Sequence, residues 1–289
     1  MTLDIAFPKT RGANNRIAHA HADEAGIIDR ILEILGIEKG WCVELGAADG
    51  TWFSNTRLLL AEKGWSGVQI EADERRFKKL GALYADRDDV ICIKSLVSTE
   101  GRDSLDEIFA RTDLPRDFDF FSLDIDGNDY HIWDSLKTYR PKLMAVEFNG
   151  TIPNEVIFVQ PCDASVSQGA SLAALIRLGK EKGYELVATT FLNAFFVRKE
   201  DFSLFNIDDN SIDAMCSPTA ATLTQLFQLY DGTIQVAGNT NLIWQEDLSM
   251  RPERFQVLPK PFRFVSPPSR LKKYGKRFWS WLYRKKLIR

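Results

Sequence analysis

The sequence lacks the features that would place it in a membrane or an oxidising compartment. It has no run of about 18 apolar residues, so we expect no transmembrane helix. Its first residues do not show the charged-then-apolar pattern of a secretory signal. The cysteines are few and scattered, without a CxxC pair, at Cys42, Cys92, Cys162 and Cys216. These absences predict a cytoplasmic protein with reduced thiols.

Positive charge is scarce over most of the chain. Of the 37 Lys and Arg residues, nine lie in residues 270–289, where no acid occurs. Residues 1–269 therefore carry 28 bases against all 40 acids. An acidic body repels nucleic acid, so we expect no nucleic-acid partner.

Short apolar segments alternate with helical patterns through the middle of the chain. Strand-like segments occur at 41–45, 67–70, 89–93, 118–123 and 142–148, with helical patterns at 55–63, 73–84, 104–111 and 129–138 between them. Their continuous apolarity is typical of strands that are buried on both faces. A helix at 169–182 and strands at 184–190 and 194–198 follow, joined by a turn that permits antiparallel pairing. This order predicts an α/β, Rossmann-like fold with five parallel strands and a terminal hairpin.

The remainder of the chain divides around this core. We expect a leader with an amphipathic helix in 1–37, the core in 38–200, an accessory region in 201–265 and a basic tail in 266–289. Within the accessory region, the pattern predicts one helix at 219–230 and a hairpin around Asn239.

A glycine-rich turn, ELGAADG at 44–50, follows the first predicted strand. A nucleotide-like cofactor must approach the backbone there, which glycine permits because it has no Cβ. The first glycine pair of GxGxxG is missing, and the two acids would repel a pyrophosphate but suit the cationic S-adenosylmethionine. The predicted cofactor-binding residues of this turn are Glu44, Gly46, Ala47, Asp49 and Gly50. A plain tight turn with a surface carboxylate is the alternative.

An acid ends the second predicted strand. Glu71 lies 21 residues after Gly50, where a carboxylate can accept hydrogen bonds from both ribose hydroxyls of a cofactor. Alone, it could instead be an acid favoured by the dipole of the next helix. We assign Glu71 to the ribose and add Ser95, after the third strand, to the cofactor-binding residues.

Acidic side chains also follow the fourth and fifth strands. Asp124 and Asp126 end the segment FFSLDIDGNDY, and Glu147 and Asn149 end the next strand. Oxygen ligands of this kind suit Mg²⁺ or Ca²⁺, so a metal at Asp124, Glu147 and Asn149 is one hypothesis. Direct orientation of a substrate without a metal is the other.

Further candidates lie close to these acids in sequence. We predict Asp124, Asp126 and His131 as catalytic residues, His131 as a general base or, equally, a packing histidine. The polar segment 149–168 is predicted to cover a sugar-like acceptor, with Asn149, Thr151, Asn154 and Glu155 as substrate-binding residues.

Four segments together resemble the FkbM-type family of S-adenosylmethionine-dependent methyltransferases. They are ELGAADG, the strand end at Glu71, SLDEIF and DFFSLDIDGNDYHIW, and the resemblance covers roughly residues 38–200. It implies a class I methyltransferase sheet, a cofactor held by Glu44, Gly46, Gly50 and Glu71, and methylation of hydroxyls on glycans or secondary metabolites. The family motif after the fourth strand is closer to D-x-E-G; Asp126 replaces that glutamate, which indicates a distinct DIDGNDY subgroup.

Two other classes of function compete with this one. Asp124 and Asp126 could hold the metal of a nucleotide-sugar glycosyltransferase. The chain could also be an inert Rossmann module that binds a partner, with its tail as an anchor.

The basic tail is amphipathic. Apolar residues recur near one face at helical spacing, at Leu271, Tyr274, Phe278, Trp281, Leu282 and Ile288, and bases fill much of the remainder. This pattern predicts a helix on an anionic membrane surface through residues 270–289, and hence a peripheral location on the inner face of the cytoplasmic membrane. Docking onto the acidic body and binding to nucleic acid are the alternatives.

Overall fold

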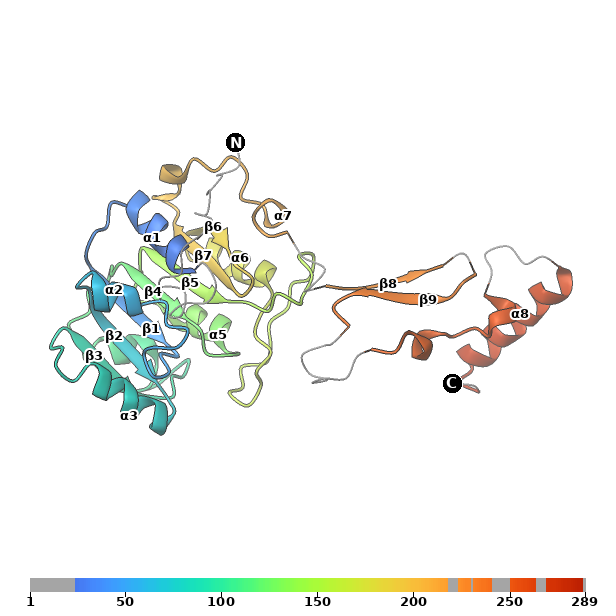
Figure 1. Ribbon diagram of the computed structural model, residues 1–289, viewed down its shortest axis with the longest axis horizontal. Helices are drawn as coiled ribbons and strands as arrows, with labels where there is room; N and C mark the ends of the chain where they lie inside the picture. Colours follow the sequence, from blue (N-terminus) through green and yellow to red (C-terminus); the bar gives the residue numbers. More distant parts are fainter. Residues whose placement is uncertain (1–23, 218–222, 230, 241–249, 264–268, 288–289) are drawn as a thin grey trace. The chain divides into compact units, whose positions relative to one another are not determined.

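The computed structural model describes residues 24–217, 223–229, 231–240, 250–263 and 269–287 (Figure 1). The chain forms two compact units, residues 1–217 and residues 218–289. The predicted core, 38–200, lies within the first unit. None of the described helices is long and apolar enough to cross a bilayer.

A seven-stranded sheet forms the centre of the first unit. Its strands are β1 (Trp41–Leu45), β2 (Ser66–Glu71), β3 (Val90–Lys94), β4 (Phe120–Leu123), β5 (Leu143–Glu147), β6 (Tyr184–Thr189) and β7 (Asn193–Arg198). They lie in the order β3-β2-β1-β4-β5-β7-β6; β7 is antiparallel to both its neighbours, and the other pairs are parallel. The predicted fold class, a Rossmann-like methyltransferase sheet with a terminal hairpin, is confirmed.

Helices cover both faces of this sheet. The helices are α1 (Glu24–Ile34), α2 (Arg57–Glu62), α3 (Glu74–Leu83), α4 (Leu105–Phe109), α5 (Asp129–Ser135), α6 (Leu172–Glu181) and α7 (Ile212–Met215), with a 3-10 turn η1 (Phe202–Phe205). One apolar core joins the sheet to α4, α5 and α6, and a second joins it to α1, α2, α3 and η1. The central strands are therefore buried on both sides, as their continuous apolarity predicts.

The strand order reverses between β1 and β4. The chain runs outward from β1 to β3 and then returns to place β4 on the other side of β1. In an open α/β sheet, ligands bind outside the carboxyl ends of the strands at such a switch point. The glycine-rich turn after β1 and the acids after β4 both lie at this position.

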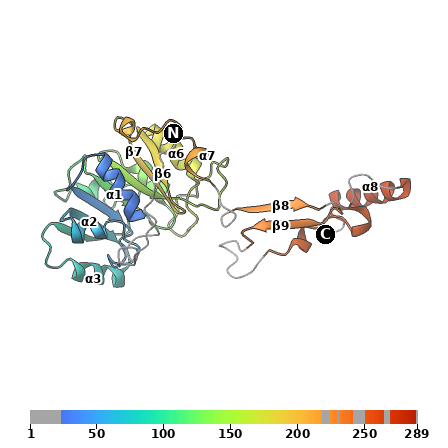
Figure 2. The same cartoon turned by 45° about the horizontal axis from the view of Figure 1, so that its top comes forward.

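The described residues of the second unit form a hairpin, two 3-10 turns and a helix, and Figure 2 shows the hairpin and the helix. The elements are β8 (Thr224–Gln228), β9 (Ile234–Gly238), η3 (Pro252–Phe255), η4 (Lys260–Phe262) and α8 (Arg270–Arg284). The helix predicted at 219–230 is wrong where it is described, because Thr224–Gln228 is a strand that pairs antiparallel with β9. The hairpin of β8 and β9 turns at Asp231-Gly232, and Gly232 supplies the positive φ of 75° that the turn needs. The hairpin predicted around Asn239 would include residues 241–249, which lie outside the described residues.

Candidate active site

A cavity of about 670 Å³ opens at the carboxyl ends of the parallel strands. Its lining comes from the turn after β1, the end of β2, the residues after β3, the loop after β4, the end of β5 and residues 164–167. The cavity therefore has two halves, one formed by β1, β2 and β3 and one formed by β4 and β5.

Gly46 joins the two halves. Its backbone has a φ of 85°, and a Cβ at this position would lie 1.9 Å from the backbone oxygen of Asp124. Gly46 thus lets the turn after β1 pack directly against the loop after β4, in addition to lining the cavity. Any side chain here would separate the two strand ends.

We expect Gly46→Ala to lower the free energy of unfolding by about 3 kcal/mol, because the new Cβ adds a backbone clash to the cost of the left-handed conformation. Gly101→Ala is the matched control, since Gly101 has a φ of 76° but a Cβ there would have no other atom within 4 Å. The control should cost about 1 kcal/mol. Urea unfolding of both variants measures the difference, and equal losses would contradict the packing role of Gly46.

Glu71 lies at the end of β2 and lines the first half of the cavity. Its Oε2 accepts a hydrogen bond from the amide of Ala48 at 2.8 Å, and its Oε1 accepts one from the amide of Asp73 at 2.7 Å. Each carboxylate oxygen has two acceptor positions, so one position on each oxygen remains. The backbone thus fixes a carboxylate that can still accept two hydrogen bonds from a ligand.

Of the other residues predicted to bind the cofactor, Asp49 and Ser95 line the cavity, whereas Ala47 and Gly50 do not. The hydroxyl of Thr51 lowers the pKa of Asp49 by hydrogen bonding, and the hydroxyl of Ser95 is buried without a protein partner. Ala47 is buried behind the cavity lining, and Gly50 packs its Cα side against Leu80 of α3.

Glu44 is placed differently from its prediction. It does not line the cavity; its buried carboxylate accepts hydrogen bonds from the Ser54 hydroxyl, the Asn55 amide and the Thr56 hydroxyl at 2.6–2.8 Å. Burial raises the pKa of Glu44 to about 7, against the lowering effect of these hydrogen bonds. Glu44 therefore anchors the segment that leads into α2 rather than facing a cofactor.

Backbone strain is concentrated at the cavity. Among the described residues, five besides glycine have positive φ, and three of them, Ala48, Phe53 and Asp126, line the cavity. Conformations of this kind cost free energy and are retained where the surrounding structure enforces them, often at functional sites. Ala48 lies in the predicted ELGAADG turn but was not among the residues assigned to the cofactor, and no motif marked Phe53.

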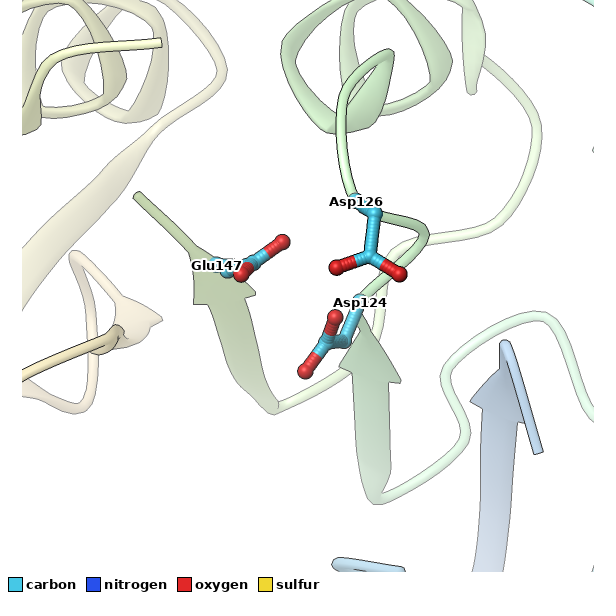
Figure 3. A group of neighbouring side chains, drawn as sticks. All are labelled: Asp124, Asp126 and Glu147. Carbon is cyan, nitrogen blue, oxygen red and sulfur yellow. The ribbon is translucent and has the colours of Figure 1, made fainter. Parts of the chain in front are cut away.

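Three carboxylates meet in the second half of the cavity (Figure 3). Asp124 follows β4, Asp126 lies two residues further along, and Glu147 ends β5; their nearest oxygens lie within 4.8 Å of one another. Burial, the charges of neighbouring aspartates and a hydrogen bond with Asp124 raise the pKa of Glu147 well above its usual value. The closeness of these acids therefore favours the protonated form of the Glu147 carboxyl.

Asp129, at the start of α5, shapes the loop that carries these acids. Its buried carboxylate accepts hydrogen bonds from the amides of Ile125 and Gly127 at 2.9 and 3.0 Å. Burial and the charge of Asp124 raise the pKa of Asp129 to about 7. Asp129 thus sets the backbone conformation in which Asp124 and Asp126 both face the cavity.

His131 is not positioned as the general base we predicted. It does not line the cavity, and its Nε2 contacts the backbone oxygen of Gln160 at 2.8 Å. Because the partner is a carbonyl, this nitrogen donates. His131 therefore helps to attach the segment 149–168 to α5.

Gln160 is the main attachment of that segment. Its side-chain amide donates to Asn128 and Val166, and its side-chain oxygen accepts from the amides of Gln168 and Gly169. These contacts bring Ala164, Val166 and Ser167 to the cavity wall. The segment does border the cavity, but through other residues than those we predicted.

The four residues predicted to bind substrate lie outside the cavity lining. Asn149 accepts from the amide and hydroxyl of Thr151 and donates to the backbone of Gln168, so its side chain is occupied in a local turn. Asn154 donates to Asp213 and Cys216, and Glu155 is exposed. Asp126 is the third carboxylate near Asp124 and Glu147, whereas the side-chain oxygen of Asn149 accepts hydrogen bonds from Thr151.

The cavity mouth carries residues that no sequence motif marked. Trp52, Phe53 and Leu96 line it and are 58–69% exposed, which is unusual for large apolar side chains. Arg76 and Lys79 of α3 supply the basic groups of the lining. Only their positions in the sequence could have indicated these residues. Trp52 and Phe53 follow β1, Leu96 follows β3, and the two bases lie in the first turns of α3.

The comparisons with known proteins concern the fold. No protein-family model matches the chain, and no curated protein matches it. Among solved structures, the N-terminal domain of EvdMO1 in the presence of SAH and D-fucose is similar, with 14% identity, a TM-score of 0.42, and coverage of 62% of this chain and 83% of that chain. A SAM dependent methyltransferase from Aquifex aeolicus has 12% identity and a TM-score of 0.38, covering 64% of this chain and 93% of that one. Aeropyrum pernix fibrillarin in complex with natively bound S-adenosyl-L-methionine has 15% identity and a TM-score of 0.37, covering 55% and 66%.

Proposed function

We propose that the first unit is an S-adenosylmethionine-dependent methyltransferase that acts on a hydroxyl group of a glycan, glycolipid or similarly polar acceptor. The observation that carries the proposal is Glu71, which ends β2, lines the cavity and keeps two free acceptor positions beside the glycine-rich turn. A ribose with two neighbouring hydroxyls fits these positions. The resemblance of residues 38–200 to FkbM-type enzymes supports the hydroxyl acceptor.

The charge of the cavity favours this cofactor over a nucleotide sugar. Five acids line the cavity, at Asp49, Glu71, Asp124, Asp126 and Glu147, against two bases, Arg76 and Lys79. Even with Glu147 protonated, the acids outnumber the bases. A cavity of this charge attracts a sulfonium and an ammonium group and repels a diphosphate.

Calorimetric titration of the full chain with S-adenosylhomocysteine, and separately with uridine diphosphate and Mg²⁺, tests the proposal. We expect saturable binding of S-adenosylhomocysteine and none of the diphosphate. Binding of the diphosphate alone would identify a glycosyltransferase instead, and binding of neither would support an inert module.

The carboxylates after β4 and β5 are suited to receive the acceptor's proton. In methyl transfer, the acceptor oxygen forms a bond to the methyl carbon while the carbon–sulfur bond breaks, and the hydroxyl proton must leave. Asp124 and Glu147 both line the cavity, and their carboxylates lie within 4.8 Å of one another at neighbouring strand ends. We assign Asp124 as the base that takes the proton and Asp126 as an orienting group for the acceptor.

A divalent cation would use Asp124, Asp126 and Glu147, whose hard oxygens are the ligands that Mg²⁺ prefers. It would lower the pKa of the acceptor hydroxyl. Because the pKa of Glu147 is raised, binding of the cation would compete with protonation of this carboxyl.

We expect methyl transfer to continue unchanged after treatment with excess EDTA, because the assigned base, Asp124, can accept the proton of the hydroxyl without a metal. Activity with labelled S-adenosylmethionine, before and after treatment, measures this. Loss of activity that added Mg²⁺ restores would assign the three carboxylates to a metal.

A further inference from the structure

The helix α8 has two apolar sides, of which one packs within the second unit and the other is exposed. One side packs within the second unit: a Cβ on Gly275 would lie 2.6 Å from the ring of Phe262, and Trp279 Nε1 donates to the backbone oxygen of Val257. The adjacent side bears an aromatic stripe, which we define as Leu271, Tyr274, Phe278 and Trp281. These side chains are 81%, 62%, 61% and 47% exposed. The packing of α8 within its own unit therefore leaves the side chains of the stripe exposed to solvent.

The stripe is exposed along one face of the helix, and two of its rings stack on each other. Residues 271, 274, 278 and 281 follow the spacing of one helix face. Phe278 and Trp281 lie nearly parallel, with their centroids 6.2 Å apart and 17° between their planes. A continuous exposed surface of this kind on a helix with no buried residue requires an apolar partner.

The charges beside the stripe restrict what that partner can be. No acid follows Glu253, and residues 254–289 carry twelve Lys and Arg residues. Lys272, Lys273, Arg277 and Arg284 are exposed on α8. The partner must therefore have an apolar region that accepts the rings. It must also carry negative charge next to that region, where the bases of α8 lie.

We propose that α8 lies flat on the surface of an anionic lipid bilayer, with the aromatic stripe at headgroup depth and the flanking bases against lipid phosphates. Tryptophan and tyrosine combine an apolar ring with a polar group, which suits the boundary between headgroups and acyl chains. A second copy of α8 would meet the stripe with the same bases, and like charges would repel. A nucleic-acid duplex would leave the apolar rings unpaired. This inference does not depend on the proposed methyl transfer.

Flotation of the full chain with phosphatidylcholine vesicles, with and without phosphatidylserine, tests the proposal. We expect binding only when phosphatidylserine is present. The double variant Phe278→Ser/Trp281→Ser should bind at least about tenfold less, because it removes the stacked rings from the bilayer. Phe227→Ser is the matched control: Phe227 is an aromatic residue of β8 that is 48% exposed, and its loss should leave binding unchanged.

Reversal of charge tests the second half of the proposal. Lys272→Glu/Lys273→Glu should abolish the preference for phosphatidylserine while circular dichroism shows an unchanged helix content. Equal flotation of the wild type and the stripe variant would overturn the proposal, as would binding that ignores phosphatidylserine. It is also overturned if the stripe mediates self-association in sedimentation, or α8 binds duplex DNA, without any binding to vesicles.

Discussion

Replacement of Glu71 by alanine is expected to weaken S-adenosylhomocysteine binding by about 100-fold or more. The variant removes a carboxylate that offers one acceptor position on each oxygen to the ribose. Hydrogen bonds to a charged group contribute about 1.5–3 kcal/mol each, and two of them account for a loss of this size. Isothermal titration of the full chain measures the affinity.

The control for this variant is Glu74→Ala. Glu74 lies three residues later, outside the cavity lining, and forms exposed ion pairs with Lys78 and Lys94. Its loss should leave the affinity unchanged. Because Glu71 also holds the amides of Ala48 and Asp73, thermal unfolding of Glu71→Ala must show a cooperative transition. A folded Glu71→Ala variant with wild-type affinity contradicts the ribose assignment.

The second large effect is expected for Asp124→Asn. An amide cannot accept the acceptor's proton, so turnover should fall by about 10²–10⁴-fold, the usual contribution of a general base. Affinity for S-adenosylhomocysteine should change little, since the cofactor is assigned to the half of the cavity formed by β1, β2 and β3. Transfer of a labelled methyl group to a panel of glycan and glycolipid acceptors measures turnover.

Asp117→Asn is the matched control for Asp124→Asn, because Asp117 is an exposed aspartate outside the cavity lining, just before β4. It should retain wild-type turnover and affinity. A parallel loss of affinity and turnover in Asp124→Asn would move Asp124 from the acceptor half to the cofactor half. Unchanged turnover would remove its role as the base.

The sheet and the position of the cavity could be predicted because they depend on local patterns. Buried parallel strands are continuously apolar, so the segments at 41–45, 118–123 and 142–148 stand out, and their order fixes where the topology reverses. Glu71 and Asp124 could be placed for the same reason. Each ends a strand, and the carboxyl ends of parallel strands share one edge of the sheet.

The predicted site residues that do not line the cavity depend on contacts between distant parts of the chain. His131 contacts Gln160, 29 residues later, and Asn154 contacts Asp213, 59 residues later. Nothing in the local sequence around His131 or Asn154 indicates those partners. Glu44 shows the opposite case, because its partners lie only 10 to 12 residues away, but an acid in a strand does not reveal which way it faces.

The second unit was predicted less well because the spacing of its apolar residues fits both the period of a helix and the period of a strand. Apolar residues in 219–230 fit a helix about as well as a strand, and the Asp231-Gly232 turn decides for the hairpin. The helix α8 was predictable because its aromatic residues and bases recur at one period over fifteen residues.

The most direct measurement of the central claim is a crystal structure of the full chain with S-adenosylhomocysteine. We predict that both ribose hydroxyls donate to the carboxylate of Glu71 and that the sulfur faces the cavity half that contains Asp124 and Glu147. A ligand bound elsewhere, or one whose ribose does not contact Glu71, would contradict the account.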